Sequence, residues 1–162
     1  MKKYLILVLI VLLIGALSVG VLAGKNGQAG KSNIAHLYLY EKDPDSWDIV
    51  EDGAWGKMKY NLSGETFDFV FNGHGLDADM DYTLIVYYGE DWPGTGICLG
   101  NGMTNSGGEI HIANSVDTGS LEDAKIWLVR SDDQECDFGM TDWNPKEYLF
   151  EYDLITFNDT DE

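Results

Sequence analysis

The sequence is poor in basic residues. It contains 10 Lys and Arg against 28 Asp and Glu, which gives a formal net charge of −18 at pH 7. A field of this sign repels the phosphates of nucleic acids and anionic lipid surfaces, so we expect neither as a partner. An acidic surface more often provides solubility than a ligand site, and we favour that interpretation.

The sequence also lacks the common catalytic motifs. No serine stands in the G-x-S-x-G turn that carries the nucleophile of α/β-hydrolases. The histidines, His36, His74 and His111, are too widely spaced to match a zinc-binding pattern. Because any two of the 28 carboxylates could form the pair that a glycosidase needs, the sequence singles out none. We therefore predict no catalytic residue, and a secreted metal-dependent hydrolase is an alternative only.

The N-terminus carries a membrane-targeting pattern. Lys2 and Lys3 precede an uncharged segment, residues 4–24, which begins with an apolar run and ends in smaller residues. This layout predicts a secretory signal peptide over residues 1–23, with cleavage before Gly24. The uncharged run is also long enough to remain as a membrane anchor. In both cases the rest of the chain is delivered outside the cytoplasm, so we expect a secreted or cell-surface protein that meets a membrane only through an uncleaved N-terminus.

Only two cysteines are present, Cys98 and Cys136. In an oxidising compartment an even number of cysteines indicates pairing, so we predict one disulfide between them. In the chain-entropy description, the loop that it closes would stabilise the fold by about 3–4 kcal/mol. Neither cysteine has a histidine or a second cysteine at ligand spacing, which argues against a metal site there.

Apolar residues alternate with polar ones along most of the remaining chain, and this period of two indicates β-strands. Ser63-Gly64-Glu65 has the composition of a turn, so its two flanking strands should form a hairpin. The only helix-start signal is Asn144-Pro145-Lys146-Glu147, which leaves room for about one turn. The predicted strands cover 34–40, 57–62, 66–72, 82–88, 96–100, 109–112, 124–129 and 150–157.

About eight strands with almost no helix predict an all-β fold, an antiparallel sandwich of Greek-key type, after the N-terminal signal or anchor helix. The runs 82–88 and 124–129 are apolar on both faces and should be central. We expect a flexible leader over residues 24–33, one β-sandwich domain over 34–157 and a frayed acidic tail over 158–162.

Several segments of this chain are similar to a group of exported proteins from environmental microbes, many of them archaeal. They are Tyr82-Thr83-Leu84-Ile85, the Gly-rich turn 100–108, Ile110-His111-Ile112, Ala124-Lys125-Ile126-Trp127-Leu128 and Trp143-Asn144-Pro145-Lys146-Glu147-Tyr148. The resemblance covers most of residues 36–157. It implies an immunoglobulin-like sandwich and an exported protein, and it carries over no activity and no functional residue.

Two acidic stretches are candidates for calcium binding. The first, Asp77-Ala78-Asp79, begins like an EF-hand loop, but Tyr82 and Tyr88 stand where such a loop needs Gly and Glu. The second carries Asp132, Asp133, Glu135 and Asp137 on a loop that the disulfide would tether. We favour solvated surface loops for both, with calcium as the only cofactor that the sequence suggests.

Tryptophans outside the strands are the candidate ligand-binding residues. Trp47, Trp55, Trp92 and Trp143 lie near Pro, Gly and Asp, whereas Trp127 reads as a core residue. Loop tryptophans can stack on sugar rings or anchor a protein partner, although more often they cover apolar surface at the edge of a small domain.

We predict a non-enzymatic extracellular or cell-surface module that binds a protein or a glycan or has a structural role. A carbohydrate-binding domain that uses the loop tryptophans is the first alternative. Asn61 and Asn158 begin tripeptides of the N-glycosylation pattern, which is a weak signal because such tripeptides are frequent by chance.

Overall fold

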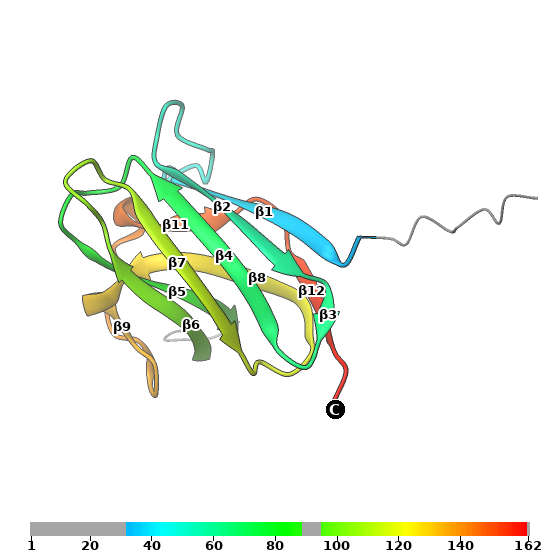
Figure 1. Ribbon diagram of the computed structural model, residues 1–162. Helices are drawn as coiled ribbons and strands as arrows, with labels where there is room; N and C mark the ends of the chain where they lie inside the picture. Colours follow the sequence, from blue (N-terminus) through cyan, green and yellow to red (C-terminus); the bar gives the residue numbers. More distant parts are fainter. Residues whose placement is uncertain (1–31, 89–94, 162) are drawn as a thin grey trace, which may run out of the picture. The chain divides into compact units, whose positions relative to one another are not determined.

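The computed structural model describes residues 32–88 and 95–161, which form β-strands joined by turns (Figure 1). This part of the chain has two short 3₁₀ segments and no α-helix, so the all-β prediction is confirmed. The strands are β1 (Ile34–Tyr40), β2 (Trp55–Asn61), β3 (Ser63–Gly64), β4 (Phe67–His74), β5 (Asp81–Tyr88), β6 (Thr95–Met103), β7 (Ile110–Val116), β8 (Leu121–Arg130), β9 (Gln134–Glu135), β10 (Gly139–Met140), β11 (Leu149–Glu151) and β12 (Ile155–Asp159). The 3₁₀ segments are η1 (Ser131–Asp133) and η2 (Pro145–Glu147).

The predicted signal peptide or anchor, 1–23, and most of the predicted leader lie outside the described residues. Within the described ranges, no helix has both the length and the apolar character to cross a membrane.

The predicted hairpin between β2 and β4 is confirmed. Met58 pairs with Phe71 and Tyr60 with Phe69, so the alternating apolar side chains of both strands enter the same core. Asn61 closes the turn: its amide nitrogen donates hydrogen bonds to the carbonyls of Ser63 and Thr66. Asn61 is only 8 % exposed, so the folded chain does not present this predicted glycosylation position to a modifying enzyme. Asn158, the other predicted position, is exposed.

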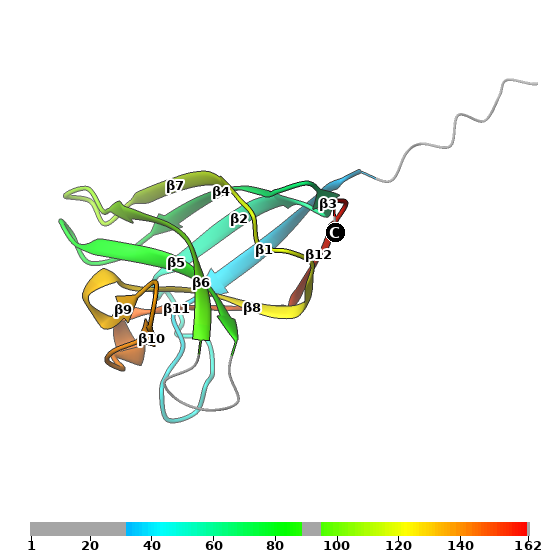
Figure 2. The ribbon, with the colours of Figure 1, turned by 90° about the horizontal axis from the view of Figure 1, so that it is seen from below.

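The strands form two facing layers, which are joined where β11 pairs with both β1 and β8. We call strands β7, β4, β2 and β1 the first layer, and strands β6, β5, β8, β11 and β12 the second layer (Figure 2). Among the described strands, every pairing is antiparallel except that of β12 with β3. As predicted, β5 and β8 are central: they pair with each other, and each has a further neighbour on its other edge.

The prediction of a single last strand over residues 150–157 is wrong. It is two strands, β11 and β12, which pair with successive parts of β8. Between them the backbone N–H of Tyr152 donates to the carbonyl of Tyr38, which draws the chain toward β1. The predicted frayed tail is also partly wrong, because β12 runs to Asp159 and Thr160 donates a backbone hydrogen bond to Gly64.

The main core fills the space between the two layers. Its largest fully buried side chains include Phe67, Phe71, Tyr82 and Phe157. A second, smaller cluster lies on the other face of the second layer and is formed by Ile85, Trp127, Val129, Met140, Tyr148 and Phe150. This second cluster explains why β5 and β8 are apolar on both faces.

Residues 131–148, which we call the cover segment, supply part of this second cluster through Met140 and Tyr148. The predicted disulfide is confirmed: Cys98 of β6 is bonded to Cys136, with their Cα atoms 5.5 Å apart. The bond fastens the cover segment to the second layer, whose surface carries the site described next.

Candidate functional site: an aromatic groove

An open groove of about 690 Å³ lies on the outer face of the second layer. It is lined by residues from a loop, two strands and the cover segment: Trp47, Tyr87, Lys125, Trp127, Thr141, Asp142 and Trp143. We call it the aromatic groove. Its volume falls in the range of small-molecule binding sites, which are typically lined by aromatic side chains with a few polar groups.

Trp127 and Tyr87 form the floor of the aromatic groove. They come from neighbouring strands, β8 and β5, and their rings are stacked with centroids 3.9 Å apart and an interplanar angle of 13°. Phe150 packs against Trp127 from β11, with its ring nearly perpendicular. Trp127 is 8 % exposed, as expected for the core residue that the sequence predicts. It nevertheless lines the groove.

Trp47 forms one wall and is 50 % exposed. It has a φ of 62°, a left-handed conformation that is rare for a bulky residue and that local structure must hold in place. Asp43 provides this support: its backbone carbonyl accepts a 2.7 Å hydrogen bond from the Trp47 N–H. Its carboxylate accepts hydrogen bonds from the backbone N–H groups of Asp45 and Ser46. These backbone hydrogen bonds favour the charged carboxylate and hold the pKa of Asp43 below its ordinary value.

Trp143 lines the groove next to Trp47 and is 36 % exposed. Its ring centroid lies 6.4 Å from that of Trp47 and 5.8 Å from that of Trp127. The planes of Trp47 and Trp143 are tilted by 37°, so the two exposed indoles are not coplanar. They line the groove at an angle to each other and do not form a flat platform.

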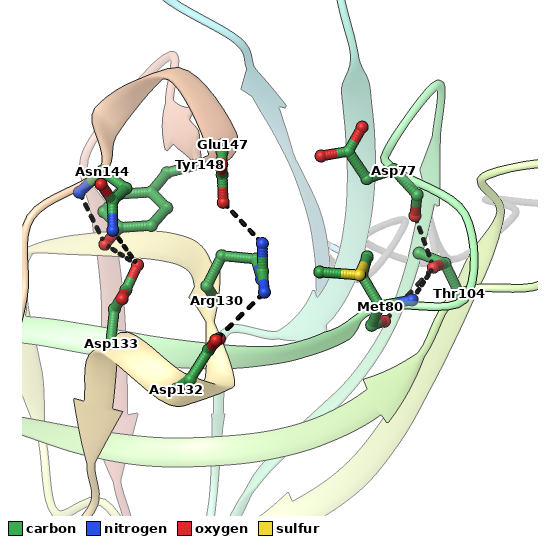
Figure 3. Close-up of polar contacts among 9 residues, drawn as sticks. All are labelled: Asp77, Met80, Thr104, Arg130, Asp132, Asp133, Asn144, Glu147 and Tyr148. Atoms are coloured by element: carbon green, nitrogen blue, oxygen red, sulfur yellow. Dashed lines mark hydrogen bonds and ion pairs between the residues drawn. The ribbon is translucent and has the colours of Figure 1, made fainter.

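A buried polar cluster positions the part of the cover segment that carries Trp143 (Figure 3). The phenol of Tyr148 donates a 2.6 Å hydrogen bond to the carboxylate of Asp133, and the side-chain amide of Asn144 donates a 3.0 Å hydrogen bond to the same oxygen. The predicted helix start at Asn144 is a single 3₁₀ turn, η2. The side chain of Asn144 makes no capping hydrogen bond, because it is directed to Asp133 instead.

The polar groups of the aromatic groove are Lys125, Asp142 and Thr141. An ammonium donates hydrogen bonds and a carboxylate accepts them, so Lys125 and Asp142 can together satisfy hydroxyl groups of either orientation. With indole faces for stacking, this set suits a ligand that has an apolar ring face and a hydroxylated rim.

The other predicted tryptophans do not join this set. Trp55 begins β2 and packs on His74, with ring centroids 4.8 Å apart, and neither residue lines the aromatic groove. Trp92 lies outside the described residues.

The predicted calcium ligands are not brought together. Two of them have protein partners, and the others are exposed. Asp133 is buried by its contacts with Tyr148 and Asn144, and Asp132 forms an ion pair with Arg130, whose guanidinium also binds Glu147 (Figure 3). The remaining predicted ligands, Asp77, Asp79, Glu135 and Asp137, are exposed surface residues. Within residues 32–88 and 95–161, no three side chains of His, Cys, Asp or Glu are grouped so that they could hold a metal ion.

Four groove residues escape prediction from the sequence: Tyr87, Lys125, Thr141 and Asp142. Lys125 and Trp127 are two residues apart on β8 and therefore share a face, and Tyr87 is the partner of Lys125 on β5. The alternation along β8 indicates that Lys125 shares a face with Trp127. The pairing of β8 with β5, which adds Tyr87, depends on the tertiary fold.

The chain matches no protein-family model, no curated protein and no solved structure. The resemblance to exported proteins stays a prediction. The function must therefore be argued from the aromatic groove itself.

Proposed function

We propose that this protein is a non-enzymatic carbohydrate-binding module that works outside the cytoplasm and holds a neutral sugar in the aromatic groove. The observation that carries the proposal is the meeting of exposed Trp47 and Trp143 above Trp127 in one groove with Lys125 and Asp142. Exposed indoles lose contact with water when a sugar ring stacks on them, and this favours binding.

The tilt between Trp47 and Trp143 favours a particular kind of ligand. Rings inclined by 37° can contact two faces of one bent or twisted sugar chain, whereas a flat crystalline surface needs coplanar rings. We therefore propose a soluble oligosaccharide or a single polysaccharide chain as the ligand of the aromatic groove.

The proposed location and the proposed fold are supported by observations outside the aromatic groove. The N-terminal pattern over residues 1–23 favours export, and the Cys98–Cys136 disulfide is compatible with an oxidising compartment. We propose an immunoglobulin-like Greek-key sandwich, since the chain leaves the first layer after β4, forms β5 and β6 in the second layer, and returns to pair β7 with β4.

A binding screen against neutral glycans tests the proposed function. The full-length protein should bind at least one neutral oligosaccharide, and binding should quench tryptophan fluorescence. Trp143→Ala and Trp47→Ala should each weaken that binding by roughly tenfold or more, as expected for exposed aromatic anchors. Trp55→Ala is the matched control, because Trp55 is 39 % exposed but lies outside the groove, and it should keep wild-type affinity.

Two results would contradict the proposal. The first is the absence of binding across the neutral glycans. The second is a loss of affinity in Trp55→Ala equal to that in Trp143→Ala, which would place the ligand elsewhere.

A further inference from the structure

The outer face of the first layer carries an unusual concentration of positive and titratable groups for so acidic a chain. All 3 histidines lie on its strands, together with Lys57 and Lys59 of β2. Their neighbours in sequence point inward to the core, so alternation places these side chains outward. We call the set His36, Tyr38, Lys57, Lys59, Asn72 and His111 the basic face.

The strand register arranges the basic face in rows across the layer. One row runs from Tyr38 through Lys57 and Asn72 to His111. The next row runs from His36 through Lys59 and Val70 to Ala113. Side chains directly opposite on adjacent strands lie close together, so each row is a continuous strip of surface.

The lysines of the basic face have no carboxylate partner. Among the described residues, neither Lys57 nor Lys59 takes part in an ion pair. The ammonium of Lys57 instead lies 5.2 Å from the centre of the Tyr38 ring, a cation–π contact. Both charges are therefore available to an anion from solution.

Two carboxylates border the paired rows of this surface. At one end Asp68 accepts hydrogen bonds from Ser115 and Thr66, and at the other Glu109 lies 3.8 Å from His74. The rows between them contain no acidic residue. At physiological ionic strength, charge interactions are screened over about 8 Å, so carboxylates on the far side of the molecule contribute little to the field at these rows.

The basic face also offers rings on which a sugar can stack. Tyr38 is 38 % exposed, and its ring is nearly parallel to that of Tyr40, with centroids 6.2 Å apart. A shallow hollow of about 540 Å³ lies on the same face, lined by Lys59, Val70 and Ala113 and, at its end, by Asp68. The surface is broad and open, which suits an extended chain better than a compact small molecule.

We infer that the basic face binds a linear polysaccharide that carries carboxylate groups. Lys57 and Lys59 are two residues apart on one strand, so their side chains are separated by about 7 Å. This sparse spacing fits a chain with about one charge per sugar, in which the carboxylates contact the lysines and the rings contact Tyr38. The inference concerns a second site and does not depend on a ligand in the aromatic groove.

Polygalacturonate and the same polymer with its carboxylates methyl-esterified are the test pair, since they share backbone and linkage and differ in charge. The full-length protein should bind polygalacturonate at physiological ionic strength, with weaker binding as salt is raised further, and should not bind the esterified polymer. The double variant Lys57→Gln, Lys59→Gln should bind with roughly tenfold lower affinity, because two charge-assisted contacts are lost. Lys146→Gln is the control for Lys59→Gln, since it removes the same charge from an exposed lysine elsewhere.

The two proposed sites can fail separately. Trp143→Ala should leave polygalacturonate binding unchanged, and the Lys57→Gln, Lys59→Gln variant should leave neutral-glycan binding unchanged. Equal binding of the charged and esterified polymers, or equal losses in Lys146→Gln and Lys59→Gln, would overturn the inference. So would a protein that binds neither polymer but forms oligomers that the double lysine variant dissociates, because the basic face would then be an interface between copies.

Discussion

Tyr148 donates a 2.6 Å hydrogen bond from its phenol to the carboxylate of Asp133, and both residues are buried beneath the segment that carries Trp143. Burial, together with the neighbouring carboxylate, raises the pKa of the Tyr148 phenol well above its ordinary value, so the phenol remains a donor at all physiological pH. A buried hydrogen bond therefore contributes to holding the wall of the aromatic groove in place.

Tyr148→Phe should destabilise the fold by about 1–3 kcal/mol, because the buried Asp133 carboxylate loses a donor that water cannot replace. Urea unfolding at pH 7 measures this directly. Tyr152→Phe is the control, since Tyr152 is 63 % exposed and its variant should stay within about 0.5 kcal/mol of wild type. Equal stability of the two variants would show that the Tyr148–Asp133 hydrogen bond does not hold the cover segment.

The carboxylate of Asp43 should make the Trp47 loop sensitive to acid. Since the folded-state pKa of Asp43 is lowered below its ordinary value of 3.8, its stabilising contribution is complete above that value and is lost as pH falls through the lower, folded pKa. Asp43→Asn removes this charge. Wild type should therefore be more stable than Asp43→Asn at pH 7, and the difference in unfolding free energy should vanish in strong acid.

Denaturant unfolding of both proteins across the acid range, with tryptophan emission as a second signal, measures the effect of Asp43. Asp45→Asn is the control, because it removes a charge from the same loop while the carboxylate that accepts the backbone hydrogen bonds remains. A difference between wild type and Asp43→Asn that stays constant with pH would argue against this role of Asp43.

Breaking the Cys98–Cys136 disulfide should destabilise the protein by about 4 kcal/mol, the chain-entropy expectation for a loop of this size. Because the disulfide fastens the cover segment, its loss should also weaken ligand binding in the aromatic groove. Thermal melting of the Cys98→Ala, Cys136→Ala variant measures the stability, and glycan titration at a temperature where it stays folded measures the binding. Unchanged affinity in the folded variant would show that the groove forms without this tether.

Local patterns predicted the strands well. The alternation of Phe67, Phe69 and Phe71 gave the inward face of β4, and the two-sided apolar runs gave β5 and β8 as central strands. These features depend on residues close together in sequence, so they can be recognised without knowledge of the fold. The break between β11 and β12 could not be recognised in this way, because it depends on a hydrogen bond from Tyr152 to Tyr38, a residue far away in sequence.

Only part of the candidate site could be predicted, because the rest depends on contacts between residues that are distant in sequence. Trp47 and Trp143 were recognised as loop residues, but nothing in the sequence indicated that they share a groove with Trp127 while Trp55 lies elsewhere. Their approach depends on the pairing of β8 with β11 and on the contacts of Asp133, both of which join distant residues. Asn144 illustrates the limit, since a local rule assigned its side chain to a helix cap and a tertiary contact with Asp133 took it instead.

Glu151 gives the opposite pH dependence from Asp43. Burial is the main influence on this carboxyl and raises its pKa above the ordinary 4.5, although its own backbone N–H and Lys42 lower it in part. Oε2 of Glu151 and the indole Nε1 of Trp127 are both buried, and the indole also lowers the pKa of this carboxyl in part. A raised folded-state pKa means that the folded protein holds the proton more tightly than the unfolded chain. The carboxyl therefore costs stability progressively as pH rises from the ordinary value toward the folded one.

Glu151→Gln keeps the shape of the side chain and removes the buried charge, so the variant should be more stable than wild type at pH 7. The advantage should shrink as pH falls and disappear below about pH 4, where the wild-type carboxyl is protonated in both states. Urea unfolding at neutral and acid pH measures the difference, and the exposed Glu122→Gln should stay within about 0.5 kcal/mol of wild type throughout. A Glu151→Gln variant that is less stable than wild type at pH 7 would show that Lys42 and its neighbours compensate for the burial of the charge.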